Sequence, residues 1–217
     1  MSKPARNAAD FVPHTTELPV LRQAIQHCWG CELYRRATQA VLGESLGDTK
    51  SAHRMEIMMI GEQPGDKEDI AGRPFVGPAG KLLMHCIHEA AIDPKRVYIT
   101  NAVKHFKWEP RGKIRLHKKP TISEVRACEP WLKAEVDAVK PRLIVCLGAT
   151  AAQALLGSKF RVSQSRGELR RAGSLPPIIA TVHPASILRA RSDDDRQKQT
   201  AEFIADLRKA DQYLGTI

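Results

Sequence analysis

Several residue types that would define a special class of protein are scarce in this sequence. Aromatic residues make up 5% of its 217 residues, and glycine and proline number 14 each, which excludes a collagen-like or low-complexity chain. No apolar run approaches the roughly 18 residues of a membrane-spanning helix. The first residues contain no apolar segment of the kind found in export signals, so we expect a cytoplasmic protein.

Cysteine is also scarce, and its five copies form an odd number. An odd count in a chain without an export signal argues against a framework of disulfides. Cys28 and Cys31 have the spacing of metal or cluster ligands, and also of redox pairs. Residues 18–27 before this pair have a helical pattern, whereas a redox pair follows a strand, so ligation is favoured. A complete site needs two more ligands from elsewhere in the chain.

Acidic residues are outnumbered, because 24 of them face 34 lysines and arginines, which leaves a net charge of +10. Such an excess favours a polyanionic partner. Residues 104–119 concentrate this charge, and Glu109 is the one acid among them. Phe106 and Trp108 lie in the same segment, and cations mixed with aromatic rings suit the phosphates and unstacked bases of a nucleic acid. The seven cations of the segment are Lys104, Lys107, Arg111, Lys113, Arg115, Lys118 and Lys119.

Short apolar runs alternate with helical segments along the chain, a pattern typical of a parallel sheet covered by helices on both faces. We therefore expect one domain over residues 1–217, with a three-layer α/β/α fold and a central, mainly parallel sheet of four strands. The first 17 residues are expected to be flexible or loosely packed. Strands are predicted at residues 55–60, 97–103, 143–147 and 178–182, and helices at 78–91, 122–139, 149–156 and 195–214.

Ligands of such sheets bind beyond the carboxyl ends of the strands. The loops at those ends cover residues 61–78, 104–120, 148–150 and 183–189. We expect the first, second and fourth of these loops, which are the richest in polar residues, to converge on one site. The first strand is followed by neither GxxxxGK[ST] nor GxGxxG, which disfavours an enzyme that uses nucleoside triphosphates.

Three residues at strand ends are candidates for chemistry. Glu62 directly follows the first strand, where a reacting carboxylate would be held rigidly, although it could also belong to a solvated acidic loop. His183 follows the fourth strand and can donate a hydrogen bond to a developing anion, although a lone histidine is more often an ordinary surface residue. Asn101 ends the second strand, and its carboxamide can read the edge of a base.

Four motifs, taken in order, resemble those of the uracil-DNA glycosylase superfamily, on its iron–sulfur family 4 side. Each motif is weak alone, but the set is specific and spans roughly residues 20–214. The motifs are Gly61-Glu62-Gln63-Pro64-Gly65, the run from Gly72 to Leu83 (Gly-Arg-Pro-Phe-Val-Gly-Pro-Ala-Gly-Lys-Leu-Leu), Asn101 at its strand end, and His183-Pro184-Ala185-Ser186-Ile187-Leu188-Arg189.

Two departures from family 4 make the chain similar to the UdgX branch, whose members become covalently attached to uracil-containing DNA. Gln63 stands where family 4 usually has alanine, and the loop after the second strand is longer. The loop of that branch usually reads Lys-Arg-Arg-Ile-His. This chain has Lys113-Ile114-Arg115-Leu116-His117, so Ile114 replaces one arginine while the histidine is kept.

The resemblance implies an enzyme that excises uracil from DNA and retains the abasic sugar through His117. Phe75 would stack on the flipped uracil, Asn101 would pair with its edge, and His183 would stabilise negative charge on O2. The implied catalytic residues are Glu62, Gln63, His117 and His183; the substrate-binding residues are Gly61, Gly65, Asp66, Phe75 and Asn101; the DNA contacts are Lys113, Arg115, Lys118, Ser186 and Arg189.

Glu62 would stabilise the sugar cation and orient or deprotonate His117, while Gln63 would position that glutamate or fill the space of a water. The implied partner is uracil-containing DNA, preferably single-stranded, and no protein partner is expected. Two other functions stay open. One is a conventional family 4-like glycosylase in which water is the nucleophile, and the other is a non-catalytic DNA-binding module stabilised by zinc.

The resemblance also implies a [4Fe–4S] cluster. Cys28, Cys31 and Cys128 match the family's cysteines, and His105 occupies the position of its remaining ligand. Zinc at the same four residues is the alternative, because its preferred ligands are the same. Cys86 is a rival fourth ligand, although it lies in a predicted helix among apolar residues. Cys146, within a central strand, is expected to be a small buried hydrophobe, as is Cys86.

Overall fold

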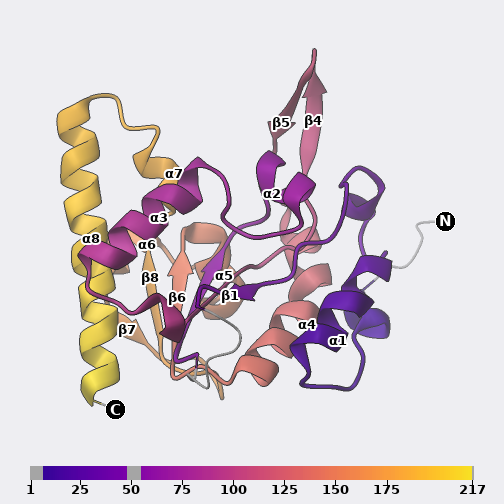
Figure 1. Ribbon diagram of the computed structural model, residues 1–217, viewed down its shortest axis with the longest axis horizontal. Helices are drawn as coiled ribbons and strands as arrows, with labels where there is room; N and C mark the ends of the chain where they lie inside the picture. The colour runs from indigo at the N-terminus through magenta and orange to yellow at the C-terminus, as the bar shows by residue number, and fades with distance from the viewer. Residues whose placement is uncertain (1–6, 48–54, 217) are drawn as a thin grey trace.

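The computed structural model describes residues 7–47 and 55–216, which form three layers around a central sheet (Figure 1). The sheet has six strands in the order β1-β3-β2-β6-β8-β7. The four inner strands are parallel, as predicted, and both edge strands pair antiparallel. The strands are β1 (Glu44–Ser45), β2 (Ile57–Gly61), β3 (Val97–Asn101), β6 (Leu143–Leu147), β7 (Leu169–Arg170) and β8 (Ile178–Thr181).

The expected four-stranded sheet is thus corrected to six strands. Every residue of the four inner strands is buried, because helices cover both faces of the sheet, and this burial explains their apolar runs. The two edge strands have two residues each, all of them half-buried or exposed. Such short strands leave no apolar run or alternation in the sequence by which they could be predicted.

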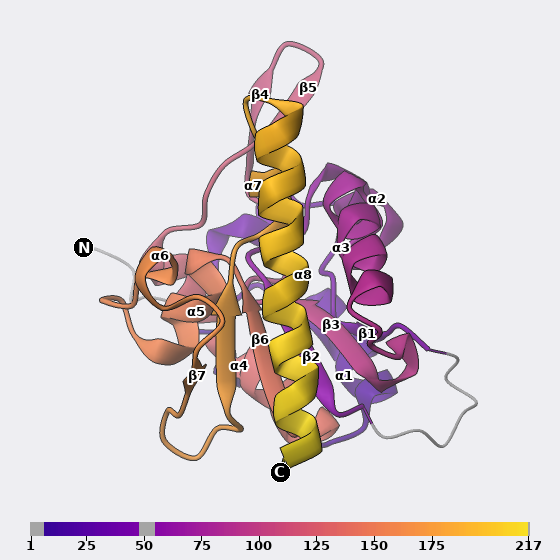
Figure 2. The same cartoon turned by 90° about the vertical axis from the view of Figure 1, so that its left-hand side faces the viewer.

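Two sets of helices cover the sheet, and Figure 2 shows α8 running along one of its faces. On that face, Leu83 and Phe203 pack with alternate residues of the strands, and on the other face Leu132 and Val136 do the same. The first face carries α3 (Pro78–Glu89), α7 (Pro184–Ile187) and α8 (Asp193–Thr216); the second carries α4 (Ile122–Val139), α5 (Ala149–Leu156) and α6 (Val162–Ser165).

A capping box starts α4. The Thr121 hydroxyl accepts a hydrogen bond from the Glu124 N–H, and the Glu124 carboxylate accepts one from the Thr121 N–H at 2.6 Å. This cap fixes the point at which the chain leaves the basic segment and enters the helix.

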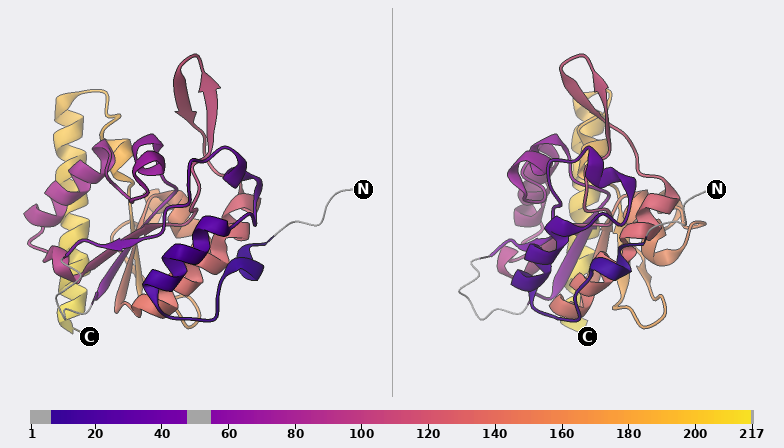
Figure 3. Two further views of the ribbon diagram at one scale, coloured as in Figure 1. Left: turned by 45° about the vertical axis from the view of Figure 1, so that its right-hand side comes forward. Right: turned by 90° about the vertical axis from the view of Figure 1, so that its right-hand side faces the viewer.

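The N-terminal segment packs on the side of α4 that faces away from the sheet, where it builds a third hydrophobic cluster (Figure 3). Leu21, Ile25 and Trp131 are fully buried in this cluster. Residues 1–6 of the expected loosely packed N-terminal segment lie outside the described residues, and Ala8 is buried against the cluster. The elements are η1 (Ala8–Phe11), α1 (Leu18–Ala24), η2 (Ile25–His27) and η3 (Glu32–Arg35).

Most of the basic segment forms a hairpin that projects from the body of the fold, where a loop was expected (Figures 1 and 3). Strand β4 (Trp108–Arg111) pairs antiparallel with β5 (Ile114–His117), and Gly112 in the turn has a φ of 59°. Glycine adopts this conformation without strain. Among the described residues, no helix has the length and apolar character needed to cross a membrane.

Candidate active site

A cleft of about 850 Å³ opens beyond the carboxyl ends of the inner strands. The loop after β2, the second strand of the hairpin, the start of α5 and the segment around α7 all line it. Three of the loops expected to converge therefore do so, and the short loop 148–150 joins them. The polar side chains that face the cleft include Glu62, Gln63, His117, Thr150, His183 and Arg189.

Glu62 follows β2 directly and is held by a neighbour from another loop. The hydroxyl of Thr150, the second residue of α5, donates a hydrogen bond to Oε2 of Glu62. The other carboxylate oxygen, Oε1, lies 3.7 Å from Nε2 of His117. That distance is too long for a hydrogen bond, so Glu62 stands beside the histidine without being bonded to it.

Gln63 connects the cleft to both ends of the hairpin. Its Oε1 accepts a hydrogen bond from the Lys107 N–H at 3.0 Å, which fixes the orientation of the amide and turns Nε2 toward the hairpin's second strand. There Nε2 donates to the Lys118 carbonyl at 3.0 Å and lies 2.9 Å from Nε2 of His117. Because the glutamine nitrogen is a donor, the histidine nitrogen must be the acceptor, and its lone pair is present.

The electrostatics keep His117 neutral. Burial lowers the pKa of its imidazole and the nearby Arg189 guanidinium lowers it further, whereas Glu62 opposes them. The net direction is downward, so the ring is uncharged at neutral pH. A neutral imidazole is a competent nucleophile once its unprotonated nitrogen is released from a hydrogen-bond donor.

His183 caps the short helix α7, and this contact sets its tautomer. Its Nδ1 accepts a hydrogen bond from the Ala185 N–H at 3.1 Å, so a neutral ring carries its proton on Nε2. Burial lowers the pKa of His183 to about 4, and Arg189 and His117 act in the same direction. His183 is therefore a neutral donor, which can hydrogen-bond an acceptor in the cleft through Nε2–H.

Asn101 ends β3 directly beside Gly61, its partner in the parallel ladder. Its side chain is 2% exposed, and its Oδ1 is a buried acceptor without a partner. A β-carbon on Gly61 would overlap this oxygen and come within 2.6 Å of the Phe75 ring, so only glycine fits between them. An unpaired buried acceptor costs free energy unless a ligand satisfies it.

Phe75 also lies beside Gly61, and its backbone is in a strained conformation with a φ of 54°. Its ring stacks on that of His183, with 5.9 Å between centroids and 30° between planes. Gly80 of α3 allows this arrangement, because a β-carbon there would collide with the Phe75 carbonyl. Phe75, Asn101 and His183, which come from three separate segments of the chain, therefore lie close together.

Arg115 anchors the hairpin to the body of the fold. It lies on β5, the strand that also carries His117. Its guanidinium contacts Oδ1 of Asp66 at 2.5 Å and Oδ2 of Asp69 at 2.6 Å, and Asp69 is fully buried. It also lies over the Trp108 ring, 5.6 Å from the centroid. Asp66, implied as a substrate contact, and Arg115, implied as a DNA contact, are therefore engaged with each other at the rim of the cleft.

Of the other implied DNA contacts, some side chains already have a partner within the protein and others do not. Lys118 pairs with Glu109 at 2.9 Å, and the Ser186 hydroxyl donates to the His183 carbonyl at 2.7 Å. Lys113 is exposed at the turn of the hairpin, and Arg189 lines the cleft. Gly65, implied as a substrate contact, is the N-cap of α2 (Asp66–Ala71) and lines the cleft.

Two residues of the basic segment are unavailable to a nucleic acid. Lys104 is fully buried, and its ammonium pairs with the fully buried carboxylate of Glu135. Phe106 is 1% exposed and packs near His117, with 5.9 Å between ring centroids. Counting cations along the segment therefore overestimates the charge that it presents to solvent.

The four expected cluster ligands border one region between the N-terminal segment and α4. Cys28 and Cys128 belong to the third hydrophobic cluster and Cys31 packs against it, while His105 borders a cavity with Cys28. Within the part of the chain that is described, no group of three or more His, Cys, Asp or Glu side chains could hold a single metal ion.

The chemistry of this donor set fits an iron–sulfur cluster. Its thiols and imidazole are the side chains that ligate such clusters, and a cluster spreads its ligands farther apart than one ion does. The Lys104 N–H donates to the Cys128 sulfur at 3.3 Å, and the buried indole N–H of Trp131 in the same cluster of side chains has no acceptor. Cys86 and Cys146 are fully buried in the two main cores, as expected.

Sequence reasoning missed Thr150 and Asp69. Thr150 lies in the loop 148–150, which was expected at the carboxyl ends of the strands. Its position two residues after Gly148 could have marked it as a residue of the site. Asp69 lies in the segment that was expected to be the first loop, and its pairing with Arg115 depends on how the hairpin folds back over α2. No feature of the sequence marks that contact.

Comparisons with known proteins show the family of this chain. The model of the uracil DNA glycosylase superfamily matches residues 49–208. The type-4 uracil-DNA glycosylase of Thermotoga maritima is 33% identical over 91% of this chain and 94% of its own length. The enzymes of the same name from Pyrobaculum aerophilum and Archaeoglobus fulgidus are 36% and 34% identical, over 87% and 88% of this chain and 93% and 90% of their own lengths. The chain belongs to the uracil-DNA glycosylase superfamily.

Proposed function

We propose that this protein, acting as one domain, excises uracil from single-stranded DNA and then binds the abasic sugar covalently through His117. The observation that carries the proposal is the placement of His117, whose neutral Nε2 lies at the cleft within reach of Gln63 and Glu62. The similarity to enzymes named type-4 uracil-DNA glycosylases supports the excision step.

Uracil would be recognised by the wall that Asn101 and Phe75 form. The free Oδ1 of Asn101 would accept a hydrogen bond from N3–H of uracil while its amide nitrogen donates to O4. Cytosine presents the reverse pattern at this edge, so it would leave two polar groups unpaired. The Phe75 ring would lie against the face of a base that has been flipped out or was already unpaired.

Cleavage would break the bond between C1′ and N1, and the bonding electron pair would leave with uracil as its anion. The Nε2–H of His183 would donate to O2, where part of the negative charge develops. Glu62, fixed by Thr150, would stabilise the positive charge that develops on the sugar. Cleavage of the bond would need no proton transfer, because His183 acts as a neutral hydrogen-bond donor and Glu62 as a fixed negative charge.

Capture would follow if His117, which lies at the cleft beside Glu62, attacks the sugar in place of water. Its Nε2 lone pair would form the bond to C1′, and the imidazole would then release its Nδ1 proton to solvent. Gln63 would position the ring before attack, release the lone pair of Nε2 as the bond to C1′ forms, and keep its hydrogen bond to the Lys118 carbonyl. The pKa of a free histidine is about 6.5, and that of His117 is lowered. Capture should therefore be half-maximal at a pH below the pKa of a free histidine.

A [4Fe–4S] cluster held by Cys28, Cys31, His105 and Cys128 would have a structural role. When bound, it would join the N-terminal segment to the residues that precede the hairpin. Lys113 and Arg189, which are not engaged in ion pairs among the described residues, would contact phosphates on either side of the cleft. Ser186 would position the segment around His183.

The test is an excision assay on a single-stranded oligonucleotide with one deoxyuridine. Wild-type protein should release uracil and give a band that survives denaturing electrophoresis, whereas His117→Ser should release uracil and give no such band. Glu62→Gln should lose both activities. A wild-type protein that releases no uracil would contradict the proposal, and zinc without iron in that protein would favour a DNA-binding module.

A conventional glycosylase is the second candidate, and the names of the relatives favour it. In that case water would add to C1′ and the enzyme would turn over many times. Abasic DNA that accumulates beyond one equivalent of protein, with no retained band, would establish this function instead.

A further inference from the structure

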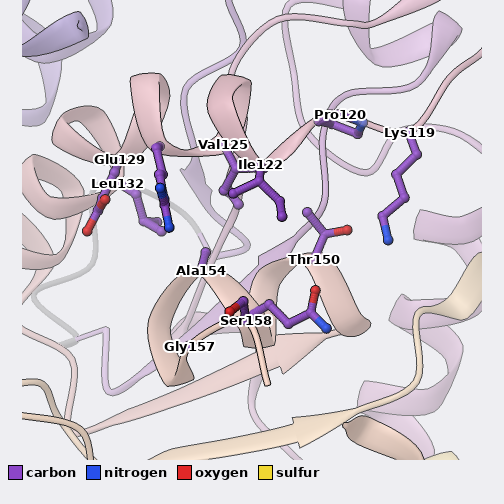
Figure 4. Close-up of a pocket in the computed structure, with 13 residues that line it drawn as sticks. Lys119, Pro120, Ile122, Val125, Glu129, Leu132, Thr150, Ala154, Gly157 and Ser158 are labelled. Carbon is purple, nitrogen blue, oxygen red and sulfur yellow. The ribbon is translucent and has the colours of Figure 1, made fainter. Parts of the chain in front are cut away.

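A second cavity of about 330 Å³ lies between α4 and α5, next to the cleft (Figure 4). Ile122 and Val125 on α4 face Ala154 on α5 across it, and Ala102 and Leu132 add to its apolar lining. Cavities of this size and lining are at the small end of those that bind small molecules or parts of larger ones.

This cavity adjoins the cleft, because Lys119 and Thr150 line both. Thr150 is also the residue whose hydroxyl holds Glu62. A group that occupies the cavity would therefore lie on the far side of Thr150 from the catalytic carboxylate. A polymer that places one unit in the cleft could reach the cavity with the next.

The cavity presents more positive than negative charge. Lys119 and Arg126 line it, and neither has a hydrogen-bond or ion-pair partner among the described residues. The one acid in its lining, Glu129, leaves an excess of one positive charge. Cations left free next to an apolar surface suit a phosphate joined to a base.

The side chain of Gln153 adds a group that can read a base. Its Nε2 donates to the Phe160 carbonyl at 3.1 Å, which orients the amide and leaves Oε1 as an acceptor. Ile122 is 64% exposed, and a base lying on it would remove that apolar surface from water.

We propose that this cavity is a subsite for the nucleotide next to the uracil on the same DNA strand. The base would pack between Ile122 and Ala154, and Lys119 and Arg126 would contact the phosphates that flank it. The inference rests on the proposed function, since it assumes that the cleft takes a nucleotide of DNA. It assigns a role to Arg126, Ile122 and Ala154 that is separate from the chemistry at Glu62.

The experiment compares uracil release from three single-stranded pentanucleotides with deoxyuridine in the centre. One is intact, and the other two lack the base on the 5′ or on the 3′ side of the uracil while keeping the phosphate. With wild-type protein, removal of the base on one side should lower the second-order rate constant for uracil release by about five- to a hundredfold. Removal on the other side should have little effect.

Two variants then locate the effect in the cavity. Ala154→Met, which fills it, and Ile122→Ser, on an exposed surface, should slow release from the intact pentanucleotide and leave the sensitive abasic one unchanged. Arg126→Ala should reduce the dependence of the logarithm of the rate constant on the logarithm of salt concentration by about 0.7. Lys198→Ala is the matched control, because it also removes one positive charge but lies on α8, across the sheet. It should leave the salt dependence unchanged.

The outcomes separate this inference from the proposed function. Wild-type protein that releases uracil equally from all three pentanucleotides would overturn the subsite while leaving the enzyme intact. Equal slowing of all three by Ile122→Ser, in a variant with an unchanged circular dichroism spectrum, would also overturn it. Release from none of them would contradict the proposed function itself.

Discussion

Asn101 offers the sharpest test of how the fold prepares the site, because its Oδ1 is buried without a partner. An unpaired buried acceptor costs about 1–3 kcal/mol, so truncation of this side chain removes a penalty as well as some packing. Asn101→Ala should therefore change the free energy of unfolding by less than about 1 kcal/mol in the absence of DNA. For a chain of this length that is a shift in Tm of at most about 4 °C.

Thr181 supplies the matched control, because it ends another of the parallel inner strands, β8. Its buried hydroxyl donates to the Asp206 carboxylate at 2.6 Å, and Thr181→Val keeps the shape while removing that bond. A hydrogen bond to a charged group contributes about 1.5–3 kcal/mol, so this variant should lower Tm by roughly 3–12 °C. Both side chains are polar and buried, but only that of Thr181 has a partner.

The assay is thermal unfolding followed by circular dichroism, together with uracil release by the same samples. Asn101→Ala should lose uracil release by about a hundredfold or more while keeping its stability. A Tm that falls as far as that of Thr181→Val would refute the reasoning, because it would mean that the Asn101 side chain holds the fold together. Full activity in Asn101→Ala would refute its role in recognising the base.

Further changes should have equally specific effects. Thr150→Val removes the donor to Glu62 and should slow uracil release about tenfold or more in single-turnover assays, and Thr150→Ser should restore it. The pKa of His183 is about 4 when folded and near 6.5 when unfolded, so the unfolded chain takes up the proton first. Stability measured with urea should thus fall by up to about 3 kcal/mol between pH 6.5 and pH 4, and less in His183→Gln. Iron analysis should find the metal lost from some serine variants and retained in others: lost in Cys28→Ser, Cys31→Ser and Cys128→Ser, and retained in Cys86→Ser and Cys146→Ser.

The central part of the fold could be predicted because both faces of the inner strands are buried. Runs such as Leu143–Leu147 have no polar residue, and the helices between them carry recognisable caps at Thr121 and Gly157. The hairpin could not be predicted in the same way. Its residues are mostly exposed, and the anchor of Arg115 on Asp69 depends on a contact between segments 46 residues apart.

The residues of the site were predictable from motifs, but their states were not. The free Oδ1 of Asn101 follows from its burial in the fold, the tautomer of His183 from its capping of α7, and the orientation of the Gln63 amide from a contact with the distant Lys107 N–H. The same holds for Lys104, which looks like a DNA-binding cation in the sequence and is fully buried against Glu135 in the fold.

The covalent role of His117 is the central claim, and one denaturing gel tests it most directly. Wild-type protein and His117→Ser are each mixed with an excess of labelled single-stranded DNA that contains one deoxyuridine. We predict a heat-stable band of one protein joined to one DNA strand for the wild type, and free abasic DNA without that band for His117→Ser. An equally strong band from His117→Ser, or no band from a wild-type protein that releases uracil, would contradict the claim.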